Sequence, residues 1–508
     1  MAEWLGLAAI ASWALLPVVI DLAHTVHIGG HWTGADGPFA ADQLNYMAWA
    51  RDEGNHFLAS DLMQTTPSAH DYLNPMLLIT GLLWRLGVGL ALALLLWTPV
   101  AIAALFWGVA AYLRRLLQRS GERAAALVLA LFYFVPAVPV LWWLGALGAG
   151  ERDRLLAPTG QAFASGELWG YLPAAISIGM IAVCLLWGER GLLAAPGRRS
   201  GPLAVSCAAA ITASWLHPWQ GLTLAVILAG VLAWGPGWRS RLPLLWALAA
   251  ALAPLIYYYV LQHVDPAWRA GARQNELPHY GLGSLLLALV PLLAPALAGL
   301  RAPGNDLQER CLLLWPIAGL LVYFILSPTF PGHGLIGITV PLAVLAVRGW
   351  RRLRVRSPVW AAAALLTLTV PGIVFTAQRY GAIVANGFQG GTLTGGEARA
   401  MRWIARSAVP GAVLAPGLLG AAVPPETGRL TWVGHASTTP DYYVRATAAE
   451  QLFDGRLSVV EVRALASLAR VRFLLSDCRG RVRIDAQLGP LLARAVPFGC
   501  ATVYQLRG

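Results

Sequence analysis

Long apolar segments alternate with short polar connections over most of the chain. The segments from Leu86 to Tyr112 and from Leu242 to Gln262 contain no charged residue. A helix needs about 20 apolar residues to cross a hydrocarbon core of about 30 Å. The pattern therefore predicts an all-α polytopic membrane domain over residues 1–375, with about eleven transmembrane helices. The crossings are expected at 4–20, 88–113, 124–147, 171–188, 202–216, 219–235, 242–262, 281–300, 311–328, 335–347 and 358–375.

One connection, between the first two crossings, is long and polar. Residues 21–75 form an outer loop in this prediction, and Asp42, Tyr46 and Glu53 recur there at helical spacing on one face. A helix with this pattern is expected to lie in the membrane interface rather than to cross the bilayer. The charges at 51–53 are interpreted as a solvated ion-pair face.

After residue 375 the apolar runs shorten and turn residues multiply, which predicts a small α/β domain over 376–508. Cys478 and Cys500 both lie beside predicted strands of this domain, so either a disulfide or two free thiols fits the sequence. Predicted helices lie at 396–407, 440–453, 458–468 and 486–493, and predicted strands at 412–415, 430–434, 471–475 and 502–506.

Composition supports the membrane class and gives the chain an orientation. The chain is 57% hydrophobic and 12% charged, with a mean hydropathy of +0.60, which excludes an ordinary soluble protein. The net charge of +12 comes from arginine without any lysine, and most loop arginines fall in inner connections if the N-terminus is inside. That distribution reports topology rather than nucleic-acid binding. All ten His then fall on the outer side or in the tail, so the chemistry is expected there.

Two regions at opposite ends of the chain resemble the GT-C superfamily. One is "DQLNYMAWARDEGNHFLASDL" (42–62) followed by "NPMLLITGLLWRLG" (74–87), and the other begins "TWVGHASTTPDYYVRATAAEQLFDG" and runs from Thr431 to Cys478. GT-C proteins are integral-membrane glycosyltransferases that use polyprenyl-phosphate-linked sugars. The resemblance implies a poorly characterised bacterial member in the cell membrane, with its active site and C-terminal domain extracytoplasmic. It also implies a polyprenyl-phosphate sugar as donor, surrounding membrane lipids, and an envelope glycan, lipid or protein as acceptor.

Asp42 is the candidate catalytic residue. Inverting transfer from a polyprenyl phosphate needs one general base for the acceptor hydroxyl, and no acid for a good leaving group. Asp42 occupies the place of the catalytic Asp in the resembled family, with Tyr46 one turn later as a substrate contact. The alternatives are that Asp42 is the N-cap of its helix, or that Asp36 is the base.

Further candidate substrate contacts lie in the outer connections of the membrane domain. Glu151 and Asp153 resemble the second acidic element of the superfamily, with Arg154 beside them as a further substrate contact. The alternative is a solvated loop in which Arg152 and Arg154 are the counter-charges. His217 beside Pro218 suits a phosphate contact or a structural role. His333 stands where relatives are expected to carry a basic residue facing the donor phosphate.

Metal dependence is left open by the sequence. No cofactor is certain and no metal-binding residue is assigned, although a divalent cation such as Mg²⁺ or Mn²⁺ is compatible with the superfamily. His24, His27 and His31 have spacings that suit a metal if helical, but no matching carboxylate or Cys pattern accompanies them. The rival function is a transporter or flippase of lipid-linked glycans. The absence of a sequence repeat and the apolar mid-segments disfavour it.

Overall fold

The computed structural model describes residues 2–234, 238–353, 358–387, 390–479 and 482–507. The chain forms two compact units. The first contains residues 1–15, 98–259 and 276–379, and the second contains residues 16–97, 260–275 and 380–508. Three helices run from one unit into the other: α1 (Ala2–His27), α12 (Leu244–Val264) and α17 (Pro358–Ala385).

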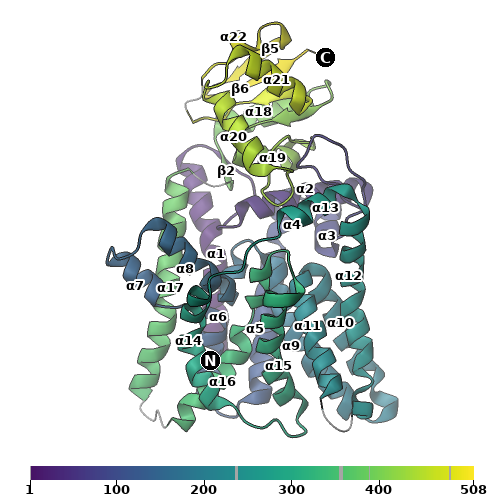
Figure 1. Cartoon of the computed structure of the whole chain (residues 1–508), viewed down its shortest axis with the longest axis vertical. Coiled ribbons are helices and arrows are strands. Elements are labelled where there is room, and N and C mark those ends of the chain that lie inside the picture. The colour runs from purple at the N-terminus through teal and green to yellow at the C-terminus, as the bar shows by residue number, and fades with distance from the viewer. Residues whose placement is uncertain (1, 235–237, 354–357, 388–389, 480–481, 508) are drawn as a thin grey trace. The chain divides into compact units, whose positions relative to one another are not determined.

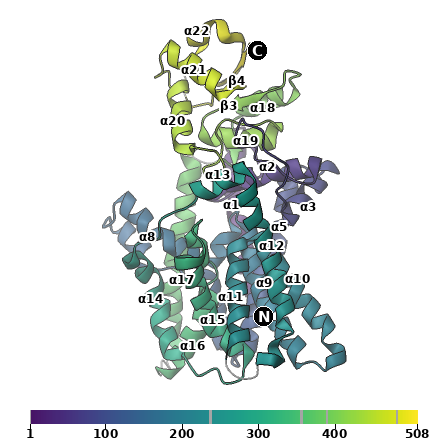
Figure 2. The same ribbon diagram turned by 45° about the vertical axis from the view of Figure 1, so that its right-hand side comes forward.

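The first unit consists of apolar helices, of which α9, α10 and α11 lie side by side (Figure 1, Figure 2). These three helices span Leu172–Leu193, Ser200–Leu216 and Pro218–Ala233. The other helices of the unit are α5 (Trp97–Leu116), α6 (Ser120–Phe132), α7 (Ala137–Trp143), α8 (Ala149–Ala162), α14 (Leu282–Gly299), α15 (Leu307–Leu321) and α16 (Thr339–Arg352). Short helical turns occur at η1 (Ala164–Leu168), η2 (Pro196–Arg198), η3 (Trp238–Arg241), η4 (Val322–Leu326) and η5 (Pro331–Leu335).

The predicted crossings correspond to helices of the structure. Within the described residues, eight helices are long and apolar enough to span a membrane, and the pair α6 and α7 forms a ninth candidate bent by 60°. The shorter apolar helices α10 and α11 occupy the two remaining predicted positions. The bend falls at Pro136, because proline lacks the backbone N–H that a continuous helix would use. The predicted fold class of a polytopic helical protein is confirmed.

Small residues bring neighbouring helices of the first unit into backbone contact. A Cβ at Gly179 on α9 would lie 2.0 Å from the carbonyl oxygen of Ala104 on α5. A Cβ at Gly349 on α16 would lie 1.8 Å from the carbonyl oxygen of Pro295 on α14. Close backbone approach through small residues is how helices pack in lipid, where a hydrophobic driving force between helices is missing.

Arginine–carboxylate pairs also join helices of the first unit. Arg115 on α5 lies 2.8 Å from Glu189 and 2.9 Å from Asp306. Arg348 on α16 is buried and lies 2.7 Å from Glu309 on α15. Glu189, Asp306 and Glu309 lie in connections that the sequence predicts to be on the inner side. In the structure each of them pairs with an arginine.

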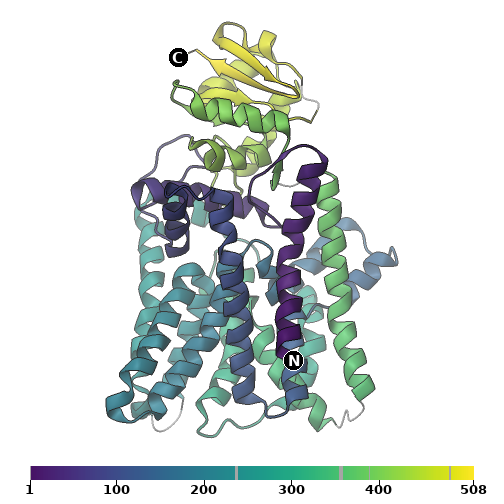
Figure 3. The same ribbon diagram turned by 180° about the vertical axis from the view of Figure 1, so that it is seen from behind.

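The second unit contains a four-stranded sheet in the order β3-β4-β6-β5. Strand β3 (Ala412–Leu414) is parallel to β4 (Val471–Leu475), whereas β4, β6 (Ala501–Leu506) and β5 (Leu492–Phe498) pair antiparallel. Helix α18 (Gly395–Arg406) packs along β5 and β6, as Figure 3 shows. The other helices here are α19 (Gly417–Thr427), α20 (Tyr442–Phe453), α21 (Val459–Ala469) and α22 (Asp485–Leu488), followed by the turn η6 (Gly489–Leu491).

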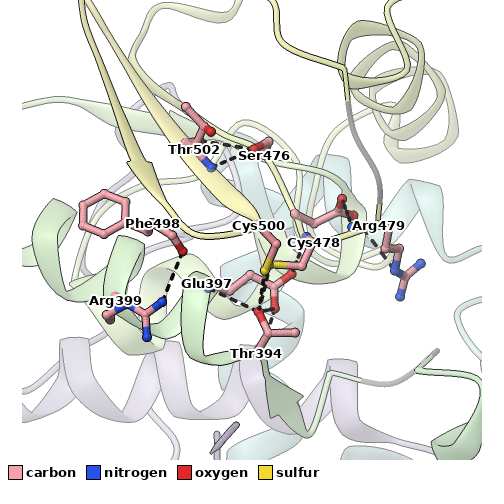
Figure 4. The surroundings of a disulfide bond; sticks show 10 residues. Thr394, Glu397, Arg399, Ser476, Cys478, Arg479, Phe498, Cys500 and Thr502 are labelled. Carbon is pink, nitrogen blue, oxygen red and sulfur yellow. Dashed lines mark hydrogen bonds and ion pairs between the residues drawn. A yellow bond between two sulfur atoms is a disulfide. The ribbon is translucent and has the colours of Figure 1, made fainter. Parts of the chain in front are cut away.

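A disulfide joins Cys478, which follows β4, to Cys500, which precedes β6 (Figure 4). The Cys478 backbone N–H donates to Glu397 at 3.0 Å, and Glu397 also closes the capping box of α18 with Thr394. The disulfide therefore lies at the start of α18 and connects two neighbouring strands.

Two predictions for the tail are wrong. The helix expected at 486–493 ends at Leu488, and β5 begins at Leu492, because pairing with β6 overrides the local apolar pattern. The strand expected at 430–434 makes only a single bridge, between Thr431 and Val413. The Thr431 N–H instead donates to the carbonyl oxygen of Leu62.

The long loop contributes helices to the second unit. Helix α2 (Ala40–His56) packs closely on α3 (Pro75–Arg85), since a Cβ at Gly81 would lie 2.0 Å from the carbonyl oxygen of Ala50. Helices α4 (Leu90–Leu95) and α13 (Pro266–Gln274) also belong here. Strand β1 (His31–Trp32) pairs with β2 (Thr392–Leu393), so backbone hydrogen bonds join the loop to the tail segment.

Helix α2 is not among the helices that are long and apolar enough to span a membrane, so its location in the membrane interface stays a prediction. Most of its residues are buried within the protein on both faces. Asp52 and Glu53 are buried as well, and Arg51 donates to the carbonyl oxygen of Pro425 and lies over the ring of Trp84. The charges at 51–53 are therefore structural contacts rather than a solvated face.

Candidate functional site

Asp42 lies in the first turn of α2 with about a third of its side chain exposed (35%). The N-cap of α2 is Phe39, which makes no side-chain capping hydrogen bond, so the N-cap interpretation of Asp42 is wrong. The Asp42 carboxylate oxygen Oδ1 lies 3.4 Å from Nε2 of His435. A carboxylate near a helix N-terminus is also favoured by the helix dipole.

His435 directs its Nε2 atom toward Asp42. The Ser437 N–H donates to His435 Nδ1 at 3.3 Å, so Nδ1 is an acceptor. In a neutral imidazole the proton is then on Nε2, the nitrogen nearest the carboxylate. The ring is buried, with 8% of its side chain exposed.

Thr439 holds the His435 segment against the first loop. Its hydroxyl oxygen accepts the N–H groups of Gly434 and His435, at 3.0 and 3.2 Å. The same hydroxyl donates to the carbonyl oxygen of Met63 at 2.9 Å. Helix α13 adds further anchors, because the side-chain amide of Gln274 donates to the carbonyl oxygens of Ala436 and Thr439. Three separate segments thus position one imidazole over Asp42.

Asp61 is a buried carboxylate of the same loop. Its oxygens accept the N–H of Met63 and the amide of Gln64, both at 2.9 Å. Burial raises the pKa of Asp61 to about 7, while the hydrogen bonds and the positive field of His435 oppose the rise. Asp61 is already engaged as an acceptor within its own loop, which distinguishes it from Asp42.

Asp36, the alternative base, is buried with 6% exposed. Burial, and then the nearby Asp21 carboxylate, raise the pKa of Asp36 to about 8. Asp36 therefore holds its proton at neutral pH and is shielded from an incoming acceptor. Of the two carboxyls, only Asp42 combines accessibility with an oriented partner, which favours it as the base.

Tyr46 lies one turn beyond Asp42 and is half-buried. Its ring is 6.0 Å from that of Trp49, which continues to Tyr72 at 4.7 Å and from there to Trp268 at 4.8 Å. The Trp268 indole N–H donates to Asp71 at 2.8 Å. Tyr46 is thus the half-buried end of an aromatic row that begins on α2.

Glu151, Asp153 and Arg154 lie on a helix, α8, rather than in a loop. Asp153 lies 2.8 Å from Arg152 and 3.2 Å from Arg379, and Glu151 lies 3.7 Å from Arg154. Each carboxylate has an arginine partner and is exposed. This arrangement matches the paired, solvated alternative that the sequence left open.

His217 and His333 come together in the first unit, with ring centroids 5.2 Å apart. His217 lies between α10 and α11, and neither of its ring nitrogens has a hydrogen-bond partner within the described residues. Aromatic rings of Tyr171 and Trp219 enclose the pair. A buried imidazole without a partner costs free energy, so this cluster of rings is a candidate for contact with a polar ligand group.

His24, His27 and His31 do not converge. Within the described residues, one group of three side chains could hold a metal ion, and it consists of Asp52, His56 and His70. His31 instead lies 3.6 Å from Glu426.

The chain is similar to known proteins in structure rather than in sequence. No family model and no curated protein matches the sequence. The oligosaccharyltransferase of Archaeoglobus fulgidus in the apo form is 12% identical with a TM-score of 0.52, over 94% of this chain and 69% of that chain. ArnT from Cupriavidus metallidurans bound to undecaprenyl phosphate is 15% identical with a TM-score of 0.52, over 98% and 97%. The arabinofuranosyltransferase AftD from Mycobacteria is 16% identical with a TM-score of 0.55, over 100% of this chain and 40% of that chain.

These likenesses define the fold of the chain. The protein is a multi-pass helical membrane protein that also carries a small mixed sheet. More particularly, it has the GT-C-like fold that the sequence resemblance implied.

Sequence reasoning did not single out His435. The only signal was indirect, since His435 lies inside the segment from Thr431 to Cys478 that carries the family resemblance. No local pattern connects it to Asp42 at the other end of the chain.

Proposed function

We propose that the protein is a membrane glycosyltransferase that moves a sugar from a polyprenyl-phosphate-linked donor to an acceptor hydroxyl. The acceptor is an envelope glycan, a lipid or a protein, and transfer inverts the anomeric centre. Asp42 is the general base, and His435 is a positioning residue that orients its carboxylate. The alternative is a flippase of lipid-linked glycans without transfer activity.

The observation that carries the proposal is the Asp42–His435 pair. Inverting transfer needs one accessible base, and Asp42 is a carboxylate with a third of its side chain exposed that lies 3.4 Å from a buried imidazole nitrogen. In the transfer step the acceptor oxygen forms a bond to the anomeric carbon, and its proton passes to Asp42. The bond to the phosphate oxygen breaks, and the phosphate leaves with the electron pair.

His217 and His333 remain predicted substrate contacts of the first unit. A neutral imidazole carries one N–H group, which can donate to a phosphate oxygen. The ArnT structure of similar fold holds undecaprenyl phosphate, which supports a polyprenyl phosphate as the donor carrier. Tyr46, Glu151, Asp153 and Arg154 remain predicted substrate contacts, and we assign no metal-dependent step.

The extracytoplasmic side of a bacterial cell membrane is the proposed location of Asp42 and of the tail. The arginine distribution supports this orientation. The Cys478–Cys500 disulfide supports it independently, because structural disulfides persist in oxidising compartments.

The test is transfer by the purified chain in lipid nanodiscs, using radiolabelled polyprenyl-phosphate carriers of mannose, arabinose, glucose and galactose. Reactions are run with Mg²⁺, with Mn²⁺ and with chelator. The Asp42→Asn variant should transfer at least about 100-fold more slowly, since a positioned base contributes roughly 10²–10⁴ to the rate. The matched control is Asp485→Asn, at a partly exposed Asp that pairs with Arg483 in the C-terminal segment, which should transfer at the wild-type rate.

Full activity of Asp42→Asn would overturn the base assignment. In proteoliposomes, movement of the labelled carrier across the bilayer without transfer to any acceptor would favour the flippase instead.

A further inference from the structure

Three metal-binding side chains converge beside the loop that follows α2. Asp52 and His56 lie one turn apart on α2, and His70 lies in the loop before α3. Nδ1 of His56 is 2.9 Å from Asp52 Oδ1, and Nε2 of His70 is 3.4 Å from Asp52 Oδ2. One ligand atom from each residue lies within 4.8 Å of the other two.

These separations suit a tetrahedral zinc ion. Zinc binds His nitrogen and carboxylate oxygen at roughly 2.0–2.2 Å, so neighbouring ligand atoms of a tetrahedron lie roughly 3.3 Å apart. His56 approaches Oδ1 of Asp52 and His70 approaches Oδ2, and the three ligand atoms lie within 4.8 Å of one another, so a rotation of the exposed imidazoles would bring them to this spacing. A ligand set of two neutral imidazoles and one carboxylate also favours zinc over magnesium, because magnesium prefers oxygen ligands alone.

The carboxylate is oriented as a metal ligand requires. Asp52 is buried, and its Oδ2 accepts both the backbone N–H and the hydroxyl of Ser60, at 2.8 and 2.9 Å. Such outer hydrogen bonds fix the direction of ligating groups. His56 and His70 are exposed, with ring centroids 4.2 Å apart, which leaves solvent access for an ion and for a water as fourth ligand.

The competing interpretation is a hydrogen-bonded ion pair without metal. In that interpretation each imidazole contacts one oxygen of Asp52 and no ion is held. A bound divalent ion instead uses both imidazoles as neutral ligands. Binding of Zn²⁺ to the stripped protein distinguishes the two interpretations.

We propose that Asp52, His56 and His70 bind one zinc ion. The ion closes the loop from 57 to 69 onto α2, and that loop carries Met63, whose carbonyl oxygen accepts the hydroxyl of Thr439 in the His435 segment. The site does not include Asp42, so its role is to hold the loop in place rather than to act on the sugar. The proposal does not depend on the proposed function.

Zinc binding is measured on the full chain, purified in detergent and stripped with chelator, without donor or acceptor. Wild-type protein should bind one Zn²⁺ per chain, counted by elemental analysis after gel filtration and titrated against a competing chromogenic chelator. Removing an outer-shell partner of a metal ligand typically costs 10–100-fold in affinity. We therefore expect a loss of about that size in Ser60→Ala, and at least as much in His56→Ala or His70→Ala. His27→Ala, at an exposed His of α1 outside the cluster, should bind as wild type does.

Cobalt binding is measured on the wild-type protein alone, so a variant that folds poorly does not affect this test. Co²⁺ added to stripped wild-type protein should give the intense visible bands of a tetrahedral site, complete at one equivalent and lost on adding Zn²⁺. The proposal is overturned if wild type binds no more Zn²⁺ than the His56→Ala/His70→Ala double variant. It is equally overturned if the cobalt bands are absent.

Discussion

Replacing Cys478 or Cys500 by serine should lower the free energy of unfolding of the C-terminal sheet by about 3 kcal/mol. The disulfide closes a loop with a sequence separation of 22 residues. In the loop-closure model the entropy removed from the unfolded chain is about 2.1 + 1.5R ln n cal/mol/K, which for this loop corresponds to about 3.4 kcal/mol at 25 °C. The loop contains α22, the turn η6 and strand β5, and it ends immediately before β6, so opening it frees one strand of the sheet and the turn that joins this strand to β6.

The assay is urea-dependent pulse proteolysis of the full chain in nanodiscs, which follows cleavage of the C-terminal segment. Cys478→Ser, Cys500→Ser and the double variant should lose the same free energy, because each opens the same loop. Cys207→Ser, at a half-buried free thiol, is the control and should change little. A double variant that loses twice as much as either single variant would refute the loop-closure reasoning. Maleimide labelling of both thiols in wild-type protein taken directly from cells would refute the extracytoplasmic location of the tail.

Two other predictions concern charges within each unit. Glu309→Ala should destabilise the solubilised protein by about 3–5 kcal/mol, because it leaves the buried Arg348 without its carboxylate; Glu122→Ala, which removes a partner from the exposed Arg351, should cost about 0–1 kcal/mol. Thermal stability by gel filtration measures both, and equal losses would contradict the expectation. Asp36 keeps its proton in the folded state up to a pKa of about 8, whereas the unfolded chain loses it near 3.8, so wild-type stability should fall as pH rises between these values. Asp36→Asn should flatten that slope in urea titrations at pH 5 and pH 8, and an unchanged slope would show that Asp36 is not the source.

Hydropathy predicted the helices of the first unit well because membrane helices satisfy their hydrogen bonds within one segment. The crossing expected at 171–188 is α9, Leu172–Leu193, and the others agree similarly. Strand β5 was not predicted, because a strand forms its backbone hydrogen bonds with another segment of the chain. The residues from 486 to 498 are apolar enough for either a helix or a strand, and the choice is made by pairing with β6, which no local pattern reports.

The candidate site was predicted in part. Helical spacing and family resemblance led to Asp42 and Tyr46, and the structure brings His217 and His333 together. His435 could not be found in this way, since its place beside Asp42 depends on Thr439 binding the carbonyl oxygen of Met63. That contact joins segments from opposite ends of the chain, and no pattern within a single sequence predicts it.

Burial, rather than sequence spacing, separates the carboxyls of the first loop into different chemical roles. Asp42 and Glu53 share one helical face by spacing, yet Glu53 is fully buried and accepts the N–H of Asn74, and burial raises its pKa to about 9. Glu53 is therefore a neutral packing group at neutral pH, like Asp36. Asp42 keeps a third of its side chain exposed and faces an imidazole N–H. A general base must be reachable by the acceptor hydroxyl, and tertiary packing leaves Asp42 more exposed than Glu53 on α2, which is why Asp42 is the residue that we propose as the base.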